Sequence, residues 1–264
     1  MTSLGPSATA DESAVLGAVA DRPLLADAVV ILTGATGGIG RSIARVLVAA
    51  GARVAVTDLV EEPVRELASD LDVLGHACDA TSWGAFRRFH ARVENELGPV
   101  RGVVNCAGLW APADYEDVDE RAFAETIRAN LETAFVSCRS VLPGMVARGA
   151  GSVVNFASTA GEYGSIRPAA HYAAAKGGVI ALTKSLAREV SPSGVRVNAV
   201  SPGPIDTPAL LAATSEQRAI AGSRTLFNRL GQPHEIAGAC AFLLSPLSTF
   251  VTGTVLQVNG GSLL

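Results

Sequence analysis

Few aromatic residues, no long apolar run and no cluster of basic residues characterise this 264-residue sequence. Aromatic residues make up 5% and charged residues 17% of the chain, whereas hydrophobic residues reach 48% and glycines number 27. That balance argues against a disordered chain, which carries more charge and fewer apolar residues. A net charge of −4 without basic runs argues against a nucleic-acid or anionic membrane partner. No apolar run reaches the ~18 residues of a membrane span.

Cysteine is also scarce, and no CxxC motif or cluster with histidine occurs among its four copies: Cys78, Cys106, Cys138 and Cys240. This spacing argues against a zinc site and against a disulfide framework. We therefore expect no bound metal and four buried, reduced thiols, which suit a cytoplasmic protein. The N-terminal residues include Asp11 and Glu12 without a basic segment, so they lack the pattern of a secretory signal.

Two kinds of segment alternate along the chain from residue 28. Seven short, nearly continuous apolar runs are rich in β-branched residues: 28–33, 52–57, 73–77, 100–105, 151–157, 195–200 and 254–258. Six longer segments have helical spacing: 38–50, 60–70, 82–97, 119–148, 171–190 and 233–245. Continuous apolar strands are typical of a sheet that is covered on both faces. The alternation predicts an α/β fold, a single Rossmann-type domain with a doubly wound, seven-stranded parallel sheet and helices on both faces.

No internal repeat or linker divides the chain after its first residues. Residues 1–22, rich in Ala, Ser, Thr and Gly, are interpreted as a flexible N-terminal extension, and residues 23–264 as one domain. The alternating pattern pauses at about 206–228, where helical patches mix with polar residues. A long connection of this kind is the natural candidate for a lid over a ligand cleft.

A glycine-rich turn, Thr33 to Gly40 (TGATGGIG), joins the first expected strand to the first expected helix. Gly34 permits a tight turn, Gly38 lets the backbone approach a pyrophosphate, and Gly40 lets the helix pack closely on the sheet. The N-terminus of the helix would then face the phosphates with free N–H groups. The turn predicts a dinucleotide site formed by six of its residues: Gly34, Thr36, Gly37, Gly38, Ile39 and Gly40.

The acidic residue that ends the second expected strand is Asp58. A carboxylate at this position accepts hydrogen bonds from the adenosine ribose and repels a 2′-phosphate. Leu59 follows it, and neither Leu59 nor Gly37 offers a basic side chain to such a phosphate. These residues favour NAD over NADP as the cofactor.

Five motifs in this order resemble the short-chain dehydrogenase/reductase family in its compact single-domain form. The glycine-rich turn matches the family's TGxxxGxG motif in full. The later matches are Asn105-Cys106-Ala107-Gly108, Ser158, the YxxxK motif of Tyr172 and Lys176, and Pro202-Gly203-Pro204-Ile205-Asp206-Thr207. Cys106 departs from the usual NNAG form and is small enough to fit. The resemblance covers about Ala28 to Gly261 and implies an oxidoreductase that acts on CH–OH groups with a nicotinamide cofactor.

The resemblance also assigns cofactor contacts beyond the glycine-rich turn and Asp58. Asp79 resembles the family's adenine-contacting acid, although an ordinary turn role suits it equally well. Ile205 and Thr207 would contact the carboxamide end of the nicotinamide. The further assigned contacts are Leu59, Asp79, Ala80, Asn105, Ala107, Gly108, Tyr172, Lys176, Pro202, Gly203, Ile205 and Thr207.

Tyr172 and Lys176 stand four residues apart in a helical segment, so they share one face. A tyrosine has a pKa near 10, and an adjacent ammonium group would lower that pKa. Tyr172 could then take a proton from an alcohol or give one to a carbonyl. By resemblance, Lys176 also binds the nicotinamide ribose and Ser158 holds the substrate oxygen. Asn130 would kink its helix and hold a water that links Lys176 to solvent.

Substrate specificity is expected from the lid, the loop after Gly108 and the segment 159–171. Candidate pocket residues in these segments are Leu109, Trp110, Glu162, Tyr163, His171, Leu210, Leu211 and Phe227. Secondary alcohols and ketones are the expected class, within which a cyclic alcohol, a hydroxysteroid and a hydroxyacyl thioester all remain open. Tetramers are common in this family, and the segments 119–148 and 171–190 contain apolar stripes. The resemblance therefore implies a homotetramer.

Two other functions remain open at this level. The first is an NADPH-dependent 3-oxoacyl-carrier-protein reductase, against which stand Asp58 and the missing arginine at Gly37. The second is a non-catalytic dinucleotide-binding sensor protein. Such a sensor is expected to lack Ser158, Tyr172 or Lys176, and all three are present.

Overall fold

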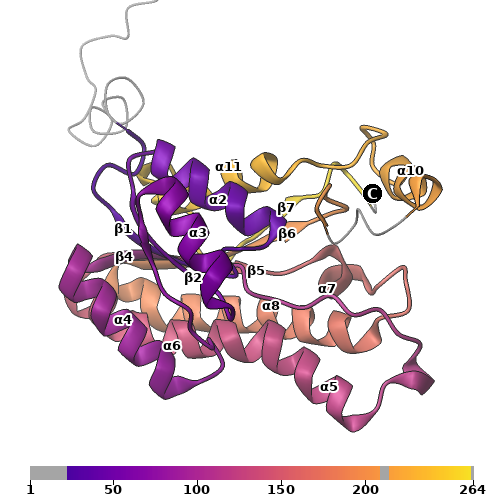
Figure 1. Cartoon of the computed structure of the whole chain (residues 1–264), viewed down its shortest axis with the longest axis horizontal. Coiled ribbons are helices and arrows are strands. Elements are labelled where there is room, and N and C mark those ends of the chain that lie inside the picture. Colours follow the sequence, from indigo (N-terminus) through magenta and orange to yellow (C-terminus); the bar gives the residue numbers. More distant parts are fainter. Residues whose placement is uncertain (1–22, 209–213, 263–264) are drawn as a thin grey trace, which may run out of the picture.

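A computed structural model describes residues 23–208 and 214–262 of the chain. Seven parallel strands form one sheet in the order β3-β2-β1-β4-β5-β6-β7 (Figure 1). The strands are β1 (Val29–Thr33), β2 (Arg53–Thr57), β3 (Leu74–Gly75), β4 (Val100–Asn105), β5 (Gly151–Phe156), β6 (Val195–Pro202) and β7 (Val255–Val258). The predicted doubly wound parallel sheet is confirmed. The strand predicted at 73–77 is shorter than expected, because only Leu74 and Gly75 pair with β2.

Helices cover both faces of the sheet (Figure 1). In chain order the α-helices are α2 (Gly38–Ala49), α3 (Glu61–Leu71), α4 (Trp83–Leu97), α5 (Glu120–Ile127), α6 (Thr133–Arg148), α7 (Thr159–Tyr163), α8 (Ala170–Val190), α10 (Ser215–Ser223) and α11 (Pro233–Leu244). Helices α2, α3 and α11 pack on one face, and α4, α6 and α8 pack on the other. The short helix α7 has no counterpart among the predicted segments, because five residues are too few to show helical periodicity.

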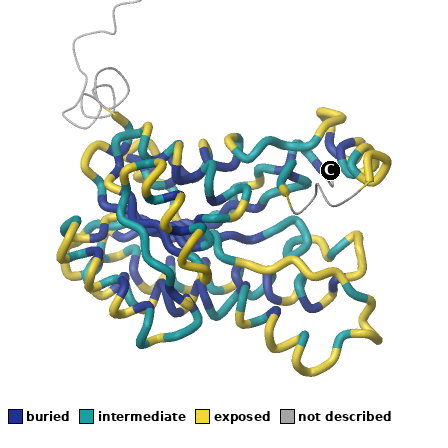
Figure 2. Tube along the Cα trace, in the orientation of Figure 1, coloured by how far each residue is buried: buried dark blue, intermediate teal, exposed yellow. Residues whose placement is uncertain are grey.

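The strands are buried on both faces, and this explains their nearly continuous apolar sequences. Along β1 the side chains alternate between the two cores: Val30 and Leu32 join the α2 side, and Val29 and Ile31 join the α4 side. Figure 2 shows the buried residues concentrated between the two helical layers. Each fully buried Val, Leu or Ile contributes roughly 1.5–3 kcal/mol, so the two cores together stabilise the sheet that carries the site.

The helix predicted over 119–148 is interrupted by a π-helical turn at Arg128–Glu132, between α5 and α6. Asn130 lies in this turn, and its Nδ2 donates to the carbonyl oxygen of Thr126 at 3.0 Å. A π-helical turn widens the backbone locally and is frequent at functional sites. The predicted distortion of the helix at Asn130 is therefore present.

The chain reverses its direction of travel across the sheet between β1 and β4. Strands β2 and β3 lie on one side of β1, while β4 to β7 follow in sequence on the other side. Ligands of open α/β sheets bind at such a switch point, outside the carboxyl ends of the strands. All the predicted cofactor segments that follow strands therefore meet at this edge.

Candidate active site

The glycine-rich turn lies at the carboxyl end of β1 and leads into α2. Gly34 has a φ of +66°, and a Cβ there would approach the backbone N of Ala107 to 2.6 Å. A Cβ on Gly40 would overlap the carbonyl oxygen of Gly34. Gly37, the N-cap of α2, supplies no side-chain cap, and the first turn holds no acidic residue. The free N–H groups and open backbone therefore fit the pyrophosphate of a dinucleotide.

Asp58 at the end of β2 is tied to the glycine-rich turn. Its Oδ2 accepts hydrogen bonds from Thr36 N at 3.0 Å and from Thr36 Oγ1 at 2.6 Å. Its Oδ1 accepts one hydrogen bond from Leu59 N at 2.8 Å. Because a carboxylate oxygen has two acceptor positions, Oδ1 keeps one for a ribose hydroxyl. The Leu59 side chain itself is exposed.

The loop after β4 is anchored to its neighbours by buried polar bonds. Thr33 Oγ1 accepts from Ala107 N at 3.2 Å, which joins the end of β1 to this loop. Asn105 Nδ2 donates to Asn155 Oδ1 at 2.8 Å, and Asn155 Nδ2 donates to Thr183 Oγ1 at 2.9 Å. These bonds fix the ends of β1, β4 and β5 and the middle of α8 relative to one another.

Ser158, Tyr172 and Lys176 converge just beyond the carboxyl end of β5. Ser158 is the N-cap of α7, where its Oγ accepts from Ala160 N at 3.2 Å. Tyr172 and Lys176 lie one turn apart on α8. The Lys176 ammonium is buried, donates to the carbonyl oxygen of Phe156 at 2.8 Å and lies 5.7 Å from the centre of the Tyr172 ring.

The pKa of Tyr172 is raised, whereas the sequence led us to expect a lowered value. Burial raises the pKa of Tyr172, and the hydrogen bond with Ser158 opposes that rise only in part. The Lys176 ammonium donates its hydrogen bond to the Phe156 carbonyl rather than to the phenol. Burial also lowers the pKa of Lys176 from 10.5 to about 8.

Gly108 is the point at which three segments of the site meet. A Cβ on Gly108 would lie 2.7 Å from Asn130 Oδ1 and 3.4 Å from Lys176 Nζ. Asn130 is buried and also clamps Leu109, because its Nδ2 donates to the Leu109 carbonyl at 2.9 Å and its Oδ1 accepts from Leu109 N at 3.3 Å. The π-helical turn thus brings Asn130 beside the loop after β4 and close to Lys176.

Asp79 forms a local turn after β3. Its Oδ1 accepts hydrogen bonds from Thr81 N at 2.9 Å and Thr81 Oγ1 at 2.7 Å, and Arg128 Nη2 donates to the same hydroxyl at 3.0 Å. The turn role considered from the sequence is therefore present. It leaves the second carboxylate oxygen of Asp79 without a hydrogen bond among the residues that the structure describes. Ala80 beside it is buried.

The segment after β6 reaches back to the glycine-rich turn. Gly203 N donates to the Val258 carbonyl at 3.2 Å, and Ile205 is buried. A Cβ on Gly38 would meet Pro208 Cδ at 2.6 Å and Thr207 Cβ at 3.2 Å. The two predicted cofactor-binding segments, far apart in the sequence, are therefore neighbours in the fold.

Three predicted pocket residues take part in structural bonds. His171 is buried, and its Nε2 lies 3.0 Å from the carbonyl oxygen of Ala111, to which it donates. This bond ties His171, at the start of α8, to the loop after β4. Glu162 Oε2 accepts from Gln257 Nε2 at 2.7 Å, and the same amide lies 2.8 Å from the Tyr163 hydroxyl. Glu162 and Tyr163 therefore join α7 to β7.

The other predicted pocket residues have different surroundings. Trp110 packs edge-on against Tyr172, with ring centres 4.7 Å apart and ring planes at 83°. Phe227 is largely exposed, beside the guanidinium of Arg229 at 5.6 Å. Leu210 and Leu211 lie outside the described residues.

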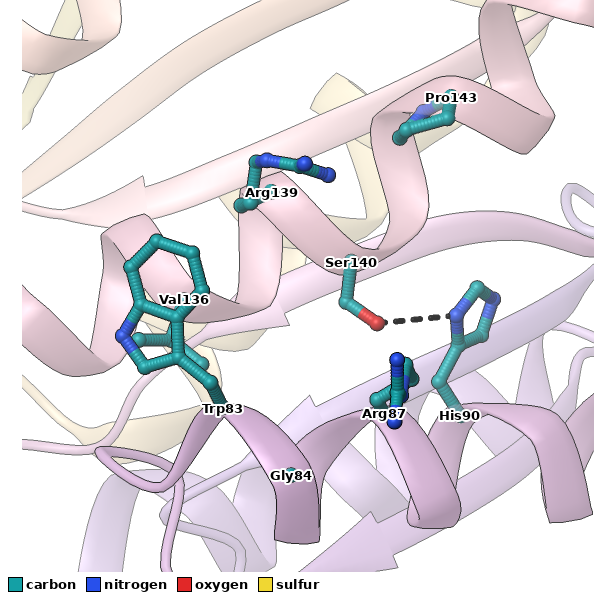
Figure 3. Close-up of a pocket in the computed structure, with 8 residues that line it drawn as sticks. All are labelled: Trp83, Gly84, Arg87, His90, Val136, Arg139, Ser140 and Pro143. Atoms are coloured by element: carbon teal, nitrogen blue, oxygen red, sulfur yellow. Dashed lines mark hydrogen bonds between the residues drawn. The ribbon is translucent and has the colours of Figure 1, made fainter.

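Two cavities lie away from the predicted catalytic residues. One, of about 370 Å³, lies between α4 and α6, where the His90 ring bonds to the Ser140 hydroxyl at 3.1 Å (Figure 3). Its lining is Trp83, Gly84, Arg87, His90, Val136, Arg139, Ser140 and Pro143. The other, of about 280 Å³, lies beside the end of β7 and includes Ile205, Phe227 and Gln257. The site at the sheet edge is defined here by its converging side chains.

Three of the cysteines are buried, and Cys106 is partly exposed. Burial raises the pKa of Cys106 and of Cys138 to about 12, so both are neutral thiols at physiological pH. Over residues 23–208 and 214–262, no cluster of three or more His, Cys, Asp or Glu side chains forms a metal site. No helix in the described part of the chain combines the length and hydropathy needed to cross a bilayer.

Several residues that shape the site escaped the sequence analysis. Gln257 holds Glu162 and Tyr163, and the carbonyls of Phe156 and Ala111 hold Lys176 and His171. A backbone carbonyl has no residue-specific signal in a sequence. Gln257 lies 95 residues from Glu162, so no local pattern could have joined them.

Comparison with known proteins agrees with this geometry. Residues 34–262 match the family model described as Enoyl-(Acyl carrier protein) reductase. An acetoacetyl-CoA reductase of Synechocystis sp. is 39% identical over 89% of this chain and 96% of its own length. The 3-oxoacyl-[acyl-carrier-protein] reductase FabG of Vibrio cholerae is 37% identical, over 88% of this chain and 96% of its own length. The cis-4-hydroxycyclohexanecarboxylate dehydrogenase of Sinomonas cyclohexanicum is 36% identical, over 89% of this chain and 96% of its own length.

A solved structure, reported as the crystal structure of gox2181, superposes with a TM-score of 0.87. It is 30% identical to this chain, and the match covers 90% of this chain and 96% of the other. The fold, the ordered motifs and these relatives define an oxidoreductase with a Rossmann-type fold. The chain belongs to the short-chain dehydrogenase/reductase family.

Proposed function

We propose that this oxidoreductase transfers a hydride between NAD(H) and a secondary alcohol or ketone, with Tyr172 as the acid and base. The observation that carries the proposal is the convergence of Ser158, Tyr172 and Lys176 at the carboxyl edge of the sheet, beside the glycine-rich turn. Bound nicotinamide would supply the hydride chemistry, and the protein supplies position and proton transfer.

Each side chain has a role that its surroundings support. Ser158 donates a hydrogen bond to the substrate oxygen and stabilises the charge that develops there. Tyr172 exchanges the proton with that oxygen. Lys176, already fixed on the Phe156 carbonyl, binds the nicotinamide ribose with its remaining N–H groups. Asn130 holds a water beside Gly108, through which Lys176 exchanges protons with solvent.

The proposed cofactor contacts follow the strand ends. The turn Gly34–Gly40 holds the pyrophosphate, and Asp58 with Leu59 holds the adenosine ribose. The adenine lies by Asp79 and Ala80, and the carboxamide lies by the segment Pro202–Thr207. Asp58 is fixed by Thr36, and its carboxylate would repel a 2′-phosphate on the adenosine ribose, which supports NAD over NADP.

A thermal-shift titration with NADH and, separately, NADPH tests the cofactor assignment. A ligand at 100 times its Kd stabilises the fold by about 2.7 kcal/mol, which corresponds to roughly 5–10 °C for a domain of this size. We expect the larger shift with NADH, and we expect Asp58→Ala to reduce the difference between the two cofactors. Equal or stronger stabilisation by NADPH in the natural protein would overturn the assignment.

Substitution of the proposed acid and base tests the reaction itself. Tyr172→Phe should lower kcat by at least about 100-fold, because positioned proton transfer contributes that much, while the NADH-induced shift persists. Tyr115→Phe, a largely exposed tyrosine outside the predicted site, is the matched control and should retain activity. Unchanged turnover in Tyr172→Phe would refute the mechanism and favour a non-catalytic dinucleotide-binding sensor.

A second candidate function is an NADPH-dependent 3-oxoacyl-carrier-protein reductase. The name of the Vibrio relative favours a 3-oxoacyl-carrier-protein substrate, and that of the Synechocystis relative favours an acetoacetyl thioester, whereas Asp58 stands against NADPH. Reduction of acetoacetyl-CoA with NADPH at a higher kcat/KM than any free ketone with NADH would place this candidate first.

The proposed setting is a cytoplasmic homotetramer. Phe123 on α5 and Phe135 on α6 are both exposed apolar side chains that a neighbouring copy would cover. We also propose that 206–228 forms a lid, in which Arg218 of α10 pairs with Asp206 at 2.8 Å. Light scattering of the purified protein measures the assembly, and a monomer would refute it.

A further inference from the structure

Trp110 lies against the ring of the proposed acid and base. The ring centres of Trp110 and Tyr172 are 4.7 Å apart and the planes meet at 83°. This is an edge-to-face arrangement, which is favourable for two aromatic rings.

The backbone on each side of Trp110 is held by residues of the catalytic region. The preceding residue, Leu109, exchanges two hydrogen bonds with Asn130, at 2.9 and 3.3 Å. The carbonyl of the following residue, Ala111, accepts from His171, which directly precedes Tyr172. The same elements that place the catalytic groups therefore fix the position of the indole.

Trp110 is nevertheless only partly covered. It keeps 39% of its surface exposed, and neighbouring Leu109 keeps 43%. Tryptophan is rarely fully buried, so what sets Trp110 apart is its contact with the Tyr172 ring. A rigidly held, partly exposed indole next to a proton-transfer group is suited to contact a ligand.

We propose that Trp110 is a specificity-determining residue, whose exposed indole surface contacts the apolar ring of a cyclic secondary alcohol or ketone. This inference rests on the proposed function and narrows its substrate class. A ring covers the flat indole surface without loss of internal freedom. An open chain covers less of it and must be ordered on binding.

Paired secondary alcohols of equal carbon number test the inference: cyclohexanol and 3-hexanol, each with NAD. We expect the natural protein to favour cyclohexanol in kcat/KM. Trp110→Ala should reduce kcat/KM for cyclohexanol about tenfold or more, the scale of one apolar contact in a pocket. The reduction for 3-hexanol should stay within about threefold, and Trp110→Phe should restore most of the loss for cyclohexanol.

Equal losses for both alcohols would overturn the inference, because Trp110 would then act only by supporting Tyr172. Such a result would leave the proposed function intact. Failure of the natural protein to oxidise either alcohol, or to reduce the matching ketones with NADH, would also overturn the inference, whereas the proposed function is tested separately by Tyr172→Phe. Failure of the inference and failure of the proposed function are therefore distinguished by different measurements.

A binding measurement remains informative if Trp110→Ala does not fold. The chain has two tryptophans, Trp83 and Trp110, so Trp83→Phe leaves Trp110 as the only indole reporter. With Tyr172→Phe added to stop turnover, cyclohexanol titrated into the NAD-loaded protein should change Trp110 emission saturably. An emission unchanged over the full titration would overturn the contact.

Discussion

The buried ammonium of Lys176 has a free-energy cost that can be measured. Burial lowers its pKa from 10.5 to about 8, and each pH unit is worth about 1.4 kcal/mol. The charged form therefore costs the fold about 3 kcal/mol at neutral pH. Because the folded protein releases this proton at a lower pH than the unfolded chain, the cost declines as pH rises from about 8 toward 10.5.

The perturbation that isolates this cost is Lys176→Met, with Lys184→Met as its matched control. These are the only two lysines of the chain, both lie on α8, and Lys184 is exposed. We expect the unfolding free energy of the natural protein, minus that of Lys176→Met, to increase by about 2 kcal/mol between pH 7 and pH 9.5. The buried thiols oppose stability at high pH in every variant, so the difference removes their contribution.

Denaturant unfolding at four or five pH values supplies the assay, with equal m-values as the condition for comparison. The difference for Lys184→Met should stay flat. A flat difference for Lys176→Met as well would show that the Lys176 pKa is not lowered. A difference that decreases with pH would show that a nearby anion raises it, and either result refutes the reasoning.

Other predictions address the packing of the site. Gly40→Ala should destabilise the fold by about 2 kcal/mol or more and abolish the NADH-induced thermal shift, because its Cβ would overlap the Gly34 carbonyl. Gly238→Ala in α11, where a Cβ meets no atom within 4 Å, should instead stabilise by about 0.5–1 kcal/mol. Asn155→Ala should cost about 2–4 kcal/mol in denaturant unfolding, because it breaks buried bonds to two neighbouring side chains. A cost below 1 kcal/mol would contradict the importance of those bonds.

The strands and the cofactor turn were predictable because their causes are local. A strand buried on both faces is nearly continuous in apolar residues, as the first four residues of Val29–Thr33 are. A turn with a positive φ at Gly34 and no room for a Cβ at Gly40 requires glycine. Such requirements depend on a few consecutive residues, so a single sequence displays them.

The ionisation of the site was not predictable in the same way. The spacing of Tyr172 and Lys176 placed both on one face of α8, but it did not show where the ammonium points. Its partner is the carbonyl of Phe156, a group that every residue carries. The lowered Lys176 pKa and the raised Tyr172 pKa arise from burial by segments far along the chain.

The sequence alone therefore determined the parallel sheet, the glycine-rich turn and which side chains are available for chemistry, because periodicity and backbone freedom are local properties. Only the tertiary structure decided which of these side chains face one another. It made His171 a support for the loop after β4, joined Glu162 to Gln257 and set Trp110 against Tyr172. The physical reason is that distances and burial depend on how the strand ends and helices pack together.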